Sequence, residues 1–146
     1  MSTNNISLPP LRVGLIGLGT VGAGTFKVLA RNQAEIRRRA GRGIEITQIA
    51  VRNVTKAKAL IGDAVPVHAD ARKLVADPSI DIVVELMGGT TDARELVLAA
   101  IANGKHVVTA NKSLLAVHGN EIFEAAGKHG VMVAFEAAVA GGVPII

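Results

Sequence analysis

The sequence of 146 residues contains no cysteine, no tryptophan and no tyrosine, and three phenylalanines are its whole aromatic content. The absence of cysteine excludes disulfides, thiolate metal sites and a cysteine nucleophile, and it is typical of a cytoplasmic protein. With so few aromatic residues, the core has to be built from Val, Ile, Leu and Ala. Such aliphatic material is typical of buried parallel sheets.

Long hydrophobic runs are also missing. Residues 1–10 have no basic start followed by an apolar stretch, so they predict a disordered tail and not a signal peptide. The most apolar run, 80–87, is interrupted by Asp81 and Glu85 and is too short to cross a bilayer. Much of the net charge of +4 lies in arginines between 31 and 42, which we interpret as a solvated helix end. Because no aromatic stacking residues accompany them, we expect no nucleic-acid partner. The short, interrupted apolar runs predict no membrane partner.

The rest of the chain alternates between strand-like apolar runs and helical patterns. The strands are expected at 11–16, 44–51, 65–68, 80–87, 106–110 and 131–136. The helices are expected at 21–39, 55–61, 70–76, 92–102 and 119–128. This order predicts an α/β fold, a doubly wound parallel sheet with helices on both faces, in one domain over 11–146.

A glycine-rich turn joins the first expected strand to the first expected helix. Gly17, Gly19 and Gly22 fit the pattern G-x-G-x-x-G, which is informative because of this strand–turn–helix context. Gly17 permits the tight turn, Gly19 lets the backbone approach a pyrophosphate, and Gly22 lets the helix pack closely. Thr20 and Val21 offer backbone amides at the helix N-terminus. The turn predicts a Rossmann-type dinucleotide site, although a glycine turn that only joins strand to helix would show the same letters.

The end of the second strand bears on the choice of cofactor. Domains selective for NAD usually place an acidic residue here to hold the ribose hydroxyls, but this strand ends on Arg52 and Asn53. The Arg52 guanidinium matches the oxygens of a 2′-phosphate, and Lys56 lies one helical turn further on. We therefore expect NADP(H) as the preferred cofactor and NAD(H) as a poorer ligand. The alternative is that both cations are simply solvated.

Three further segments lie at or near the carboxyl ends of expected strands, which is the ligand-binding edge of such sheets. They are 85–89 (ELMGG), 104–112 (GKHVVTANK) and 135–144 (FEAAVAGGVP). With these segments, residues 11–146 resemble the N-terminal part of homoserine dehydrogenase, most clearly in VVTANKSLLAVHG at 107–119 and FEAAVAGGVPII at 135–146. The resemblance implies reduction of L-aspartate 4-semialdehyde to L-homoserine with NAD(P)H in amino-acid biosynthesis.

The resemblance also implies roles for individual residues. Lys112 matches a lysine close to nicotinamide and substrate, as a catalytic partner or a cofactor contact, and Asn111 beside it would orient a ligand or fix the turn. Gly88, Gly89 and Thr90 match the loop that passes the nicotinamide. A surface lysine and a plain strand terminator are the alternatives for Lys112 and for the two glycines.

A monovalent cation, sodium, is implied as well. Its ligands would be the Glu136 carboxylate and the carbonyl oxygens of Val139, Gly141 and Val143, because a hard cation needs several oxygens. The alternative is that Glu136 caps the next helix.

The sequence stops at the start of a further helix near Pro144. We therefore interpret it as a fragment of a longer chain that lacks its substrate domain, and we expect the full-length protein to be a homo-oligomer. The fragment is expected to bind cofactor without turning over. Two other functions fit the same residues: another semialdehyde or amino-acid dehydrogenase of this fold, and a non-catalytic NAD(P)-sensing module.

Overall fold

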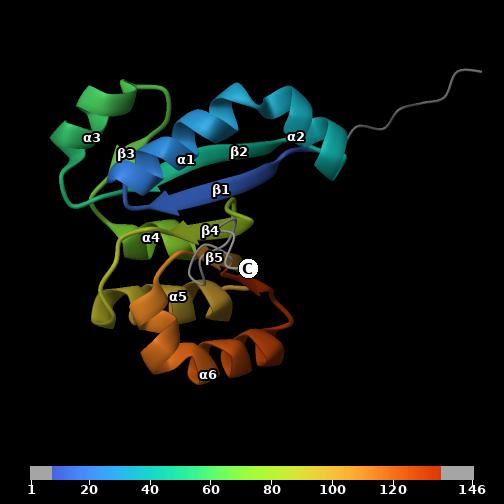
Figure 1. The fold of residues 1–146 in the computed structure, drawn as a ribbon, viewed down its shortest axis with the longest axis vertical. Coiled ribbons are helices and arrows are strands. Elements are labelled where there is room, and N and C mark those ends of the chain that lie inside the picture. Colours follow the sequence, from blue (N-terminus) through green and yellow to red (C-terminus); the bar gives the residue numbers. More distant parts are fainter. Residues whose placement is uncertain (1–7, 136–146) are drawn as a thin grey trace, which may run out of the picture.

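The computed structural model describes residues 8–135. Each apolar run of the sequence forms a strand and each helical pattern forms one or two helices (Figure 1). In chain order the elements are β1 (Leu11–Ile16), α1 (Thr20–Arg31), α2 (Gln33–Ala40), β2 (Ile44–Ala50), α3 (Val54–Ile61), β3 (Val67–His68), α4 (Ala71–Ala76), β4 (Ile82–Glu85), α5 (Thr91–Ala102), β5 (His106–Thr109), α6 (Lys112–His129) and β6 (Val133–Ala134).

The six strands form one sheet in the order β3-β2-β1-β4-β5-β6, and every neighbouring pair is parallel. The direction in which the chain adds strands reverses between β1 and β4. In an open α/β sheet, the loops that leave such neighbouring strands diverge and open a crevice at their carboxyl ends. The topology therefore confirms the predicted doubly wound fold and places a ligand crevice between the β1–α1 and β4–α5 loops.

Two aliphatic cores lie on opposite faces of the sheet. One contains Val13, Leu15 and Ile49, with α1 and α3 packed against it. The other contains Val83 and Val107 together with the inner sides of α4, α5 and α6. Because side chains alternate along a strand, a strand between two cores has to be apolar on both faces. This explains the continuous apolar runs from which the strands were predicted.

The long helix expected over 21–39 is two helices in the structure. They meet at Asn32, which has φ −102° and ψ 21°. The Gln33 side-chain amide donates to the Leu29 carbonyl at 2.9 Å and to the Ile44 carbonyl at 2.6 Å. A side-chain donor thus occupies the Leu29 carbonyl, which would accept from the Gln33 amide in an unbroken helix. The break sits where α2 is tied to the start of β2.

The helix expected over 119–128 is longer in the structure and begins at Lys112. Its N-cap is Asn111, whose side chain accepts a hydrogen bond from the Leu114 amide at 3.0 Å. Asparagine is a favoured N-cap because its short side chain reaches the free amides of the first turn. Similarly, Asp70 caps α4, where its side chain accepts from the Arg72 and Lys73 amides.

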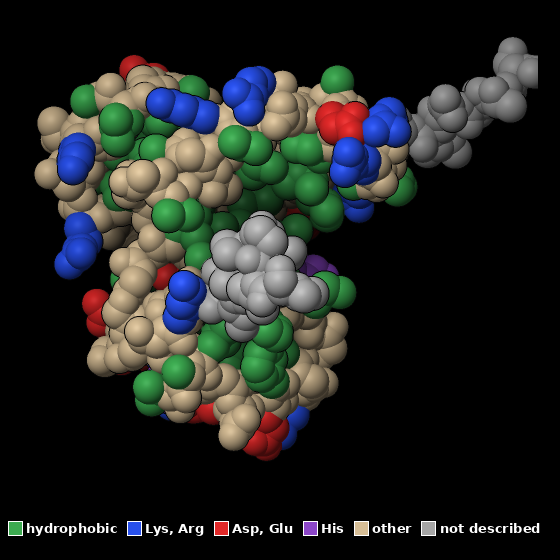
Figure 2. Space-filling model, in the orientation of Figure 1, with side chains coloured by type: hydrophobic (Ala, Val, Ile, Leu, Met, Phe, Trp, Pro, Cys, Tyr) green, Lys and Arg blue, Asp and Glu red, His purple; other side chains and the backbone are tan. Residues whose placement is uncertain are grey.

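The basic stretch of the sequence forms the exposed end of α2. Arg38 and Arg39 both pair with Glu35, and Figure 2 shows Lys and Arg side chains beside acidic ones over this helix. Such exposed pairs are screened by water and contribute little to stability. In residues 8–135, no helix has the length and hydropathy that a bilayer crossing requires.

Candidate dinucleotide-binding site

The turn after β1 is tight and can be formed only by glycine at its first position. Gly17 has φ +96°, a region that other residues rarely adopt. A Cβ at this position would lie 2.7 Å from the Leu86 carbonyl oxygen, in the loop that follows β4. Gly17 therefore lets the β1–α1 and β4–α5 loops touch at the point where the strand order reverses.

The other two glycines of the pattern have different surroundings. A Cβ on Gly22 would lie 2.2 Å from the Gly17 carbonyl oxygen, so α1 packs directly on the turn. A Cβ on Gly19 would meet nothing within 4 Å. Gly19 is also the N-cap of α1, with no side chain to cover the amides of Thr20 and Val21. The first turn of α1 thus faces an open space with bare backbone donors.

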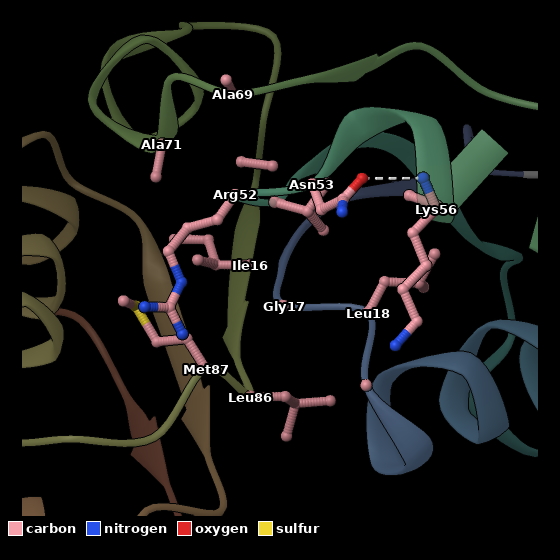
Figure 3. Close-up of a pocket in the computed structure, with 14 residues that line it drawn as sticks. Ile16, Gly17, Leu18, Arg52, Asn53, Lys56, Ala69, Ala71, Leu86 and Met87 are labelled. Carbon is pink, nitrogen blue, oxygen red and sulfur yellow. Dashed lines mark hydrogen bonds between the residues drawn. The ribbon is translucent and has the colours of Figure 1, made fainter.

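A pocket of about 360 Å³ opens in front of this turn. Its walls are Gly17, Leu18 and Gly19 on one side and the residues from Ala50 to Asn53 on the other. Arg52 and Lys56 are the only charged residues among the described ones that line it. In Figure 3 the Arg52 guanidinium lies beside Met87, and the Lys56 amine points toward the turn that carries Leu18. The structure thus brings the two predicted cations to the same pocket as the glycine turn.

The local fold around Asn53 explains how the two cations are held. Arg52 follows β2 directly, and Asn53 caps α3 by accepting a hydrogen bond from the Lys56 amide at 2.9 Å. This bond occupies the Asn53 oxygen, the one side-chain oxygen among the described residues that line the pocket. The groups left to meet a ligand are the two cations and the bare backbone amides, which suit an anion.

A second, smaller pocket of about 180 Å³ lies across the switch point. It is lined by Val21, Glu85, Leu86, Gly88, Ala110 and Asn111. Gly88 and Gly89 have φ +76° and +77°, so the loop uses two successive left-handed residues. Thr90 follows as the N-cap of α5. Gly88 therefore contributes backbone alone to this wall.

Asn111 links the two loops that border the second pocket. Its side-chain amide donates to the Gly89 carbonyl oxygen at 2.6 Å, while its oxygen caps α6. Asn111 therefore fixes the turn, and its predicted contact with cofactor remains a prediction. Lys112 is the first residue of α6 and is exposed. This position is at the positive end of the helix dipole, and no acidic residue occupies the first turn of α6.

Two residues that the sequence reasoning left without a role contribute to this region. Glu85 is fully buried at the end of β4, and Thr109 is its neighbour at the end of β5. The Thr109 hydroxyl donates to Glu85 Oε2 at 2.7 Å. The sequence feature that could have indicated a role for Glu85 is its position as a lone carboxylate in an otherwise apolar strand, three residues before two glycines.

The most strongly shifted carboxyl group lies away from both pockets. Hydrogen bonds from Ser79 and Gln48 lower the pKa of Asp77 to about 2. Nearby, burial lowers the pKa of Lys105, whose amine donates to the carbonyl oxygens of Asp77 and Ile80 at 2.5 and 2.9 Å. Both residues precede strands, so they lie at the amino edge of the sheet. Their pKa shifts therefore reflect structural bonds and do not mark a catalytic site.

The remaining predicted site residues cannot be placed. Glu136, Val139, Gly141 and Val143, the expected sodium ligands, lie outside the described residues, as do residues 1–7 of the expected tail.

The strand order, the glycine turn and the pocket together define a dinucleotide-binding domain of the Rossmann class. The family model for the NAD-binding domain of homoserine dehydrogenase matches residues 17–136. The chain belongs to this family.

Individual relatives agree with the family match. The chain is 63% identical over 139 residues to a homoserine dehydrogenase of Pseudomonas aeruginosa, covering 95% of this chain and 32% of that protein. Among solved structures, a homoserine dehydrogenase from Thiobacillus denitrificans superposes with a TM-score of 0.88 at 63% identity, covering 93% of this chain and 31% of that one. The enzyme from S. aureus gives a TM-score of 0.82 at 38% identity, covering 89% of this chain and 33% of that one. The chain thus spans about a third of the length of the relatives that it matches.

Proposed function

We propose that this chain holds NADP(H) for a longer protein that reduces L-aspartate 4-semialdehyde to L-homoserine. The observation that carries the proposal is the pocket at the switch point, which joins a bare glycine turn to Arg52 and Lys56. The family relationship supports the reaction, because relatives that are three times longer bear the name homoserine dehydrogenase.

The pyrophosphate of the cofactor would lie against the first turn of α1. Gly19 leaves room for it, since a Cβ there would have no neighbour within 4 Å. The amides of Thr20, Val21 and Gly22 would donate to its oxygens, and the dipole of α1 would favour its charge. The open pocket and the uncapped helix therefore fit the group.

Arg52 and Lys56 would select the phosphorylated form of the cofactor. Arg52 enters the pocket from the β2–α3 connection and Lys56 from the first turn of α3, where the adenosine ribose lies in domains of this class (Figure 3). A guanidinium can donate two parallel hydrogen bonds to a 2′-phosphate, and the lysine adds a point charge. We therefore propose that NADP(H) binds more tightly than NAD(H).

The second pocket, which Gly88 and Asn111 line, would receive the nicotinamide end, with Gly89 and Thr90 following Gly88 in the same loop. The bound cofactor supplies the hydride. Lys112, at the start of α6, would place its ammonium near the substrate oxygen, where it stabilises the negative charge that develops and can transfer a proton. The substrate pocket and a second proton-transfer group would come from the longer protein.

Three further parts of the proposal concern that longer protein. It would act in the cytoplasm as a homo-oligomer. The Glu136 carboxylate and the carbonyl oxygens of Val139, Gly141 and Val143 would hold a sodium ion.

Calorimetric titration of the chain with NADPH and with NADH tests the cofactor proposal. We expect both to bind, with NADPH tighter by about tenfold, which corresponds to roughly one additional charge-assisted hydrogen bond. The chain alone is expected to give no homoserine oxidation, while the longer protein oxidises homoserine with NADP⁺. Absence of binding by either nucleotide would contradict the proposal, and so would turnover by the chain alone.

A further inference from the structure

The Glu85 carboxylate is a buried charged group for which the proposed function gives no use. Its side chain has no exposed surface, and it ends a strand, Ile82–Glu85, that is otherwise apolar. Burying a carboxylate is unfavourable unless hydrogen bonds replace its water. Three such bonds are present: Oε1 accepts from the Met87 amide at 2.8 Å and from the Gly88 amide at 3.2 Å, and Oε2 accepts from the Thr109 hydroxyl at 2.7 Å.

These bonds are part of a closed ring around the second pocket. From Glu85 the ring passes along the β4–α5 loop to the Gly89 carbonyl oxygen, which accepts from the Asn111 side chain at 2.6 Å. The backbone amide of Asn111 in turn donates to Thr109 Oγ1 at 3.0 Å, and the Thr109 hydroxyl donates to the Glu85 carboxylate. Glu85 and Thr109 are register partners at the ends of the neighbouring strands β4 and β5. One carboxylate can therefore hydrogen-bond to the loop after β4 and to Thr109, the residue from which the loop after β5 begins.

The ring fixes the two loops that flank the proposed nicotinamide position. One loop carries Gly88 and Gly89, whose left-handed backbone needs an external tie to hold one conformation. The other loop leads directly into Lys112, the first residue of α6. The hydrogen bonds of the Glu85 side chain go to Met87, Gly88 and Thr109, so the ring does not include the residues proposed to hold the adenosine end.

We propose that Glu85 is a positioning residue: with Thr109 and Asn111, it sets the β4–α5 loop and the start of α6 at the spacing that the nicotinamide ring requires. The inference rests on the proposed function, because it assumes that a nicotinamide dinucleotide occupies the switch point. It predicts a division of labour in which the adenosine end binds independently of Glu85 and the nicotinamide end depends on it.

The test compares NADPH with 2′-phosphoadenosine diphosphate ribose, which is the same cofactor without its nicotinamide. Glu85→Gln keeps the size of the side chain but turns an amide donor toward Thr109 Oγ1, so the hydroxyl hydrogen of Thr109 loses its acceptor. We expect Glu85→Gln to weaken NADPH binding about tenfold, since a buried partner is lost, and to leave the affinity for the analogue within about twofold. The emission of bound NADPH, which reports on the surroundings of the dihydronicotinamide, is expected to fall toward that of the free nucleotide.

Two variants of the second ring member keep the test decisive if Glu85→Gln fails to fold. Thr109→Val removes the hydroxyl at similar volume and is expected to reproduce the selective loss, whereas Thr109→Ser restores the hydroxyl and most of the affinity for NADPH. Lys105→Met is the matched control, because it removes a buried polar side chain with two hydrogen bonds at the opposite edge of the sheet. It is expected to lower stability without separating the two ligands.

The measured Kd values for the two ligands decide between the alternatives. Selective loss of NADPH binding in Glu85→Gln or Thr109→Val supports the inference. Equal losses for both ligands, no loss for either, or the same separation in Lys105→Met would overturn it. A parent chain that binds neither ligand would instead refute the proposed function.

Discussion

The two halves of the sheet build their ligand-binding loops in opposite ways. In the half that contains β1 to β3, the glycine turn is bare: Gly19 has open space around it, and no side chain caps α1. In the half that contains β4 to β6, the loops are braced by buried side chains, with Glu85, Thr109 and Asn111 forming a hydrogen-bonded ring. In the first half the backbone amides of the turn have no side-chain partner, whereas in the second half the polar side chains hydrogen-bond to one another and to the loop backbone.

This difference corresponds to two tasks. An anionic pyrophosphate can be held by free amides and a helix dipole, so the first half needs open space more than precise side chains. A reacting ring has to be held within a small distance of its partner group, and an error of about 1 Å can lower a rate by two orders of magnitude. We therefore expect the first half to provide most of the affinity for the cofactor and the second half to position its nicotinamide ring.

The largest expected effect is on turnover, in the second half. In the longer protein, Lys112→Ala is expected to lower kcat by roughly 10²- to 10³-fold, because a group that stabilises developing charge is lost, while the Kd for NADPH changes less than about threefold. Steady-state kinetics and titration measure the two quantities. Lys128→Ala, at the exposed far end of the same helix, is the control. A loss of NADPH affinity as large as the loss of kcat would contradict the expectation that Lys112 acts in the reaction and not in cofactor binding.

The next effect is on affinity, in the first half. Gly19→Val is expected to weaken NADPH binding at least about 100-fold, because the side chain fills the space for the pyrophosphate, yet to lower stability by only about 1 kcal/mol, because Val is a poorer N-cap than Gly. Gly17→Val is expected to cost about 2–4 kcal/mol of unfolding free energy as well, because of its φ of +96° and its contact with Leu86.

Urea unfolding and calorimetry separate these two glycine effects. Gly24→Ala, inside α1 and with no atom within 4 Å of the added Cβ, is the control and is expected to raise stability by up to about 1 kcal/mol. If Gly19→Val binds NADPH normally, the pyrophosphate does not lie against this turn.

The two halves also differ in how much of their loop structure the sequence can predict, because one depends on local residues and the other on a contact between distant ones. The glycine turn was predicted because its three roles follow from six consecutive residues and one neighbouring strand. The cap of α4 by Asp70 is equally local. The ring was not predicted, because it depends on Glu85 and Thr109 meeting across 24 residues of chain. Only the pairing of β4 with β5 brings them together.

Helix boundaries show the same limit. The break at Asn32 depends on a bond from Gln33 to Ile44, which local periodicity does not contain. The early start of α6 was missed for a different reason. Asn111 is a recognisable cap, but His118 and Gly119 are weak helix formers, and Gly119 is tolerated in the helix because it is buried. Tertiary packing therefore overrides propensity in this stretch.

A smaller effect concerns cofactor choice in the first half. Arg52→Gln is expected to weaken NADPH binding about tenfold, because a charge-assisted bond to the 2′-phosphate is lost, and to change NADH binding less than about twofold. The ratio of the two Kd values is the measurement. Arg31→Gln, at the exposed end of α1 and outside the pocket, is the control. Equal weakening of both cofactors would mean that Arg52 acts only through general charge.

The smallest effect lies outside both sets of loops, at the amino edge of the sheet. The pKa of Asp77 is about 2 in the folded chain and has an ordinary value of 3.8. Its contribution to stability is therefore complete above about pH 4 and is lost as the pH falls toward 2. Asp77→Asn is expected to flatten the fall of the urea midpoint in this window, whereas exposed Asp63→Asn leaves the slope unchanged. An unchanged slope in Asp77→Asn would show that other groups control acid stability.

The most direct test of the central claim is an amide-detected NMR titration of the chain with NADPH. We expect the largest shifts on the amides of Thr20 and Val21, which no side chain caps in the free protein, and on those of Gly19 and Gly22 beside them. These shifts are expected to saturate together with that of the Arg52 amide. Saturating NADPH that leaves these amides unshifted would contradict the claim that the turn binds the pyrophosphate.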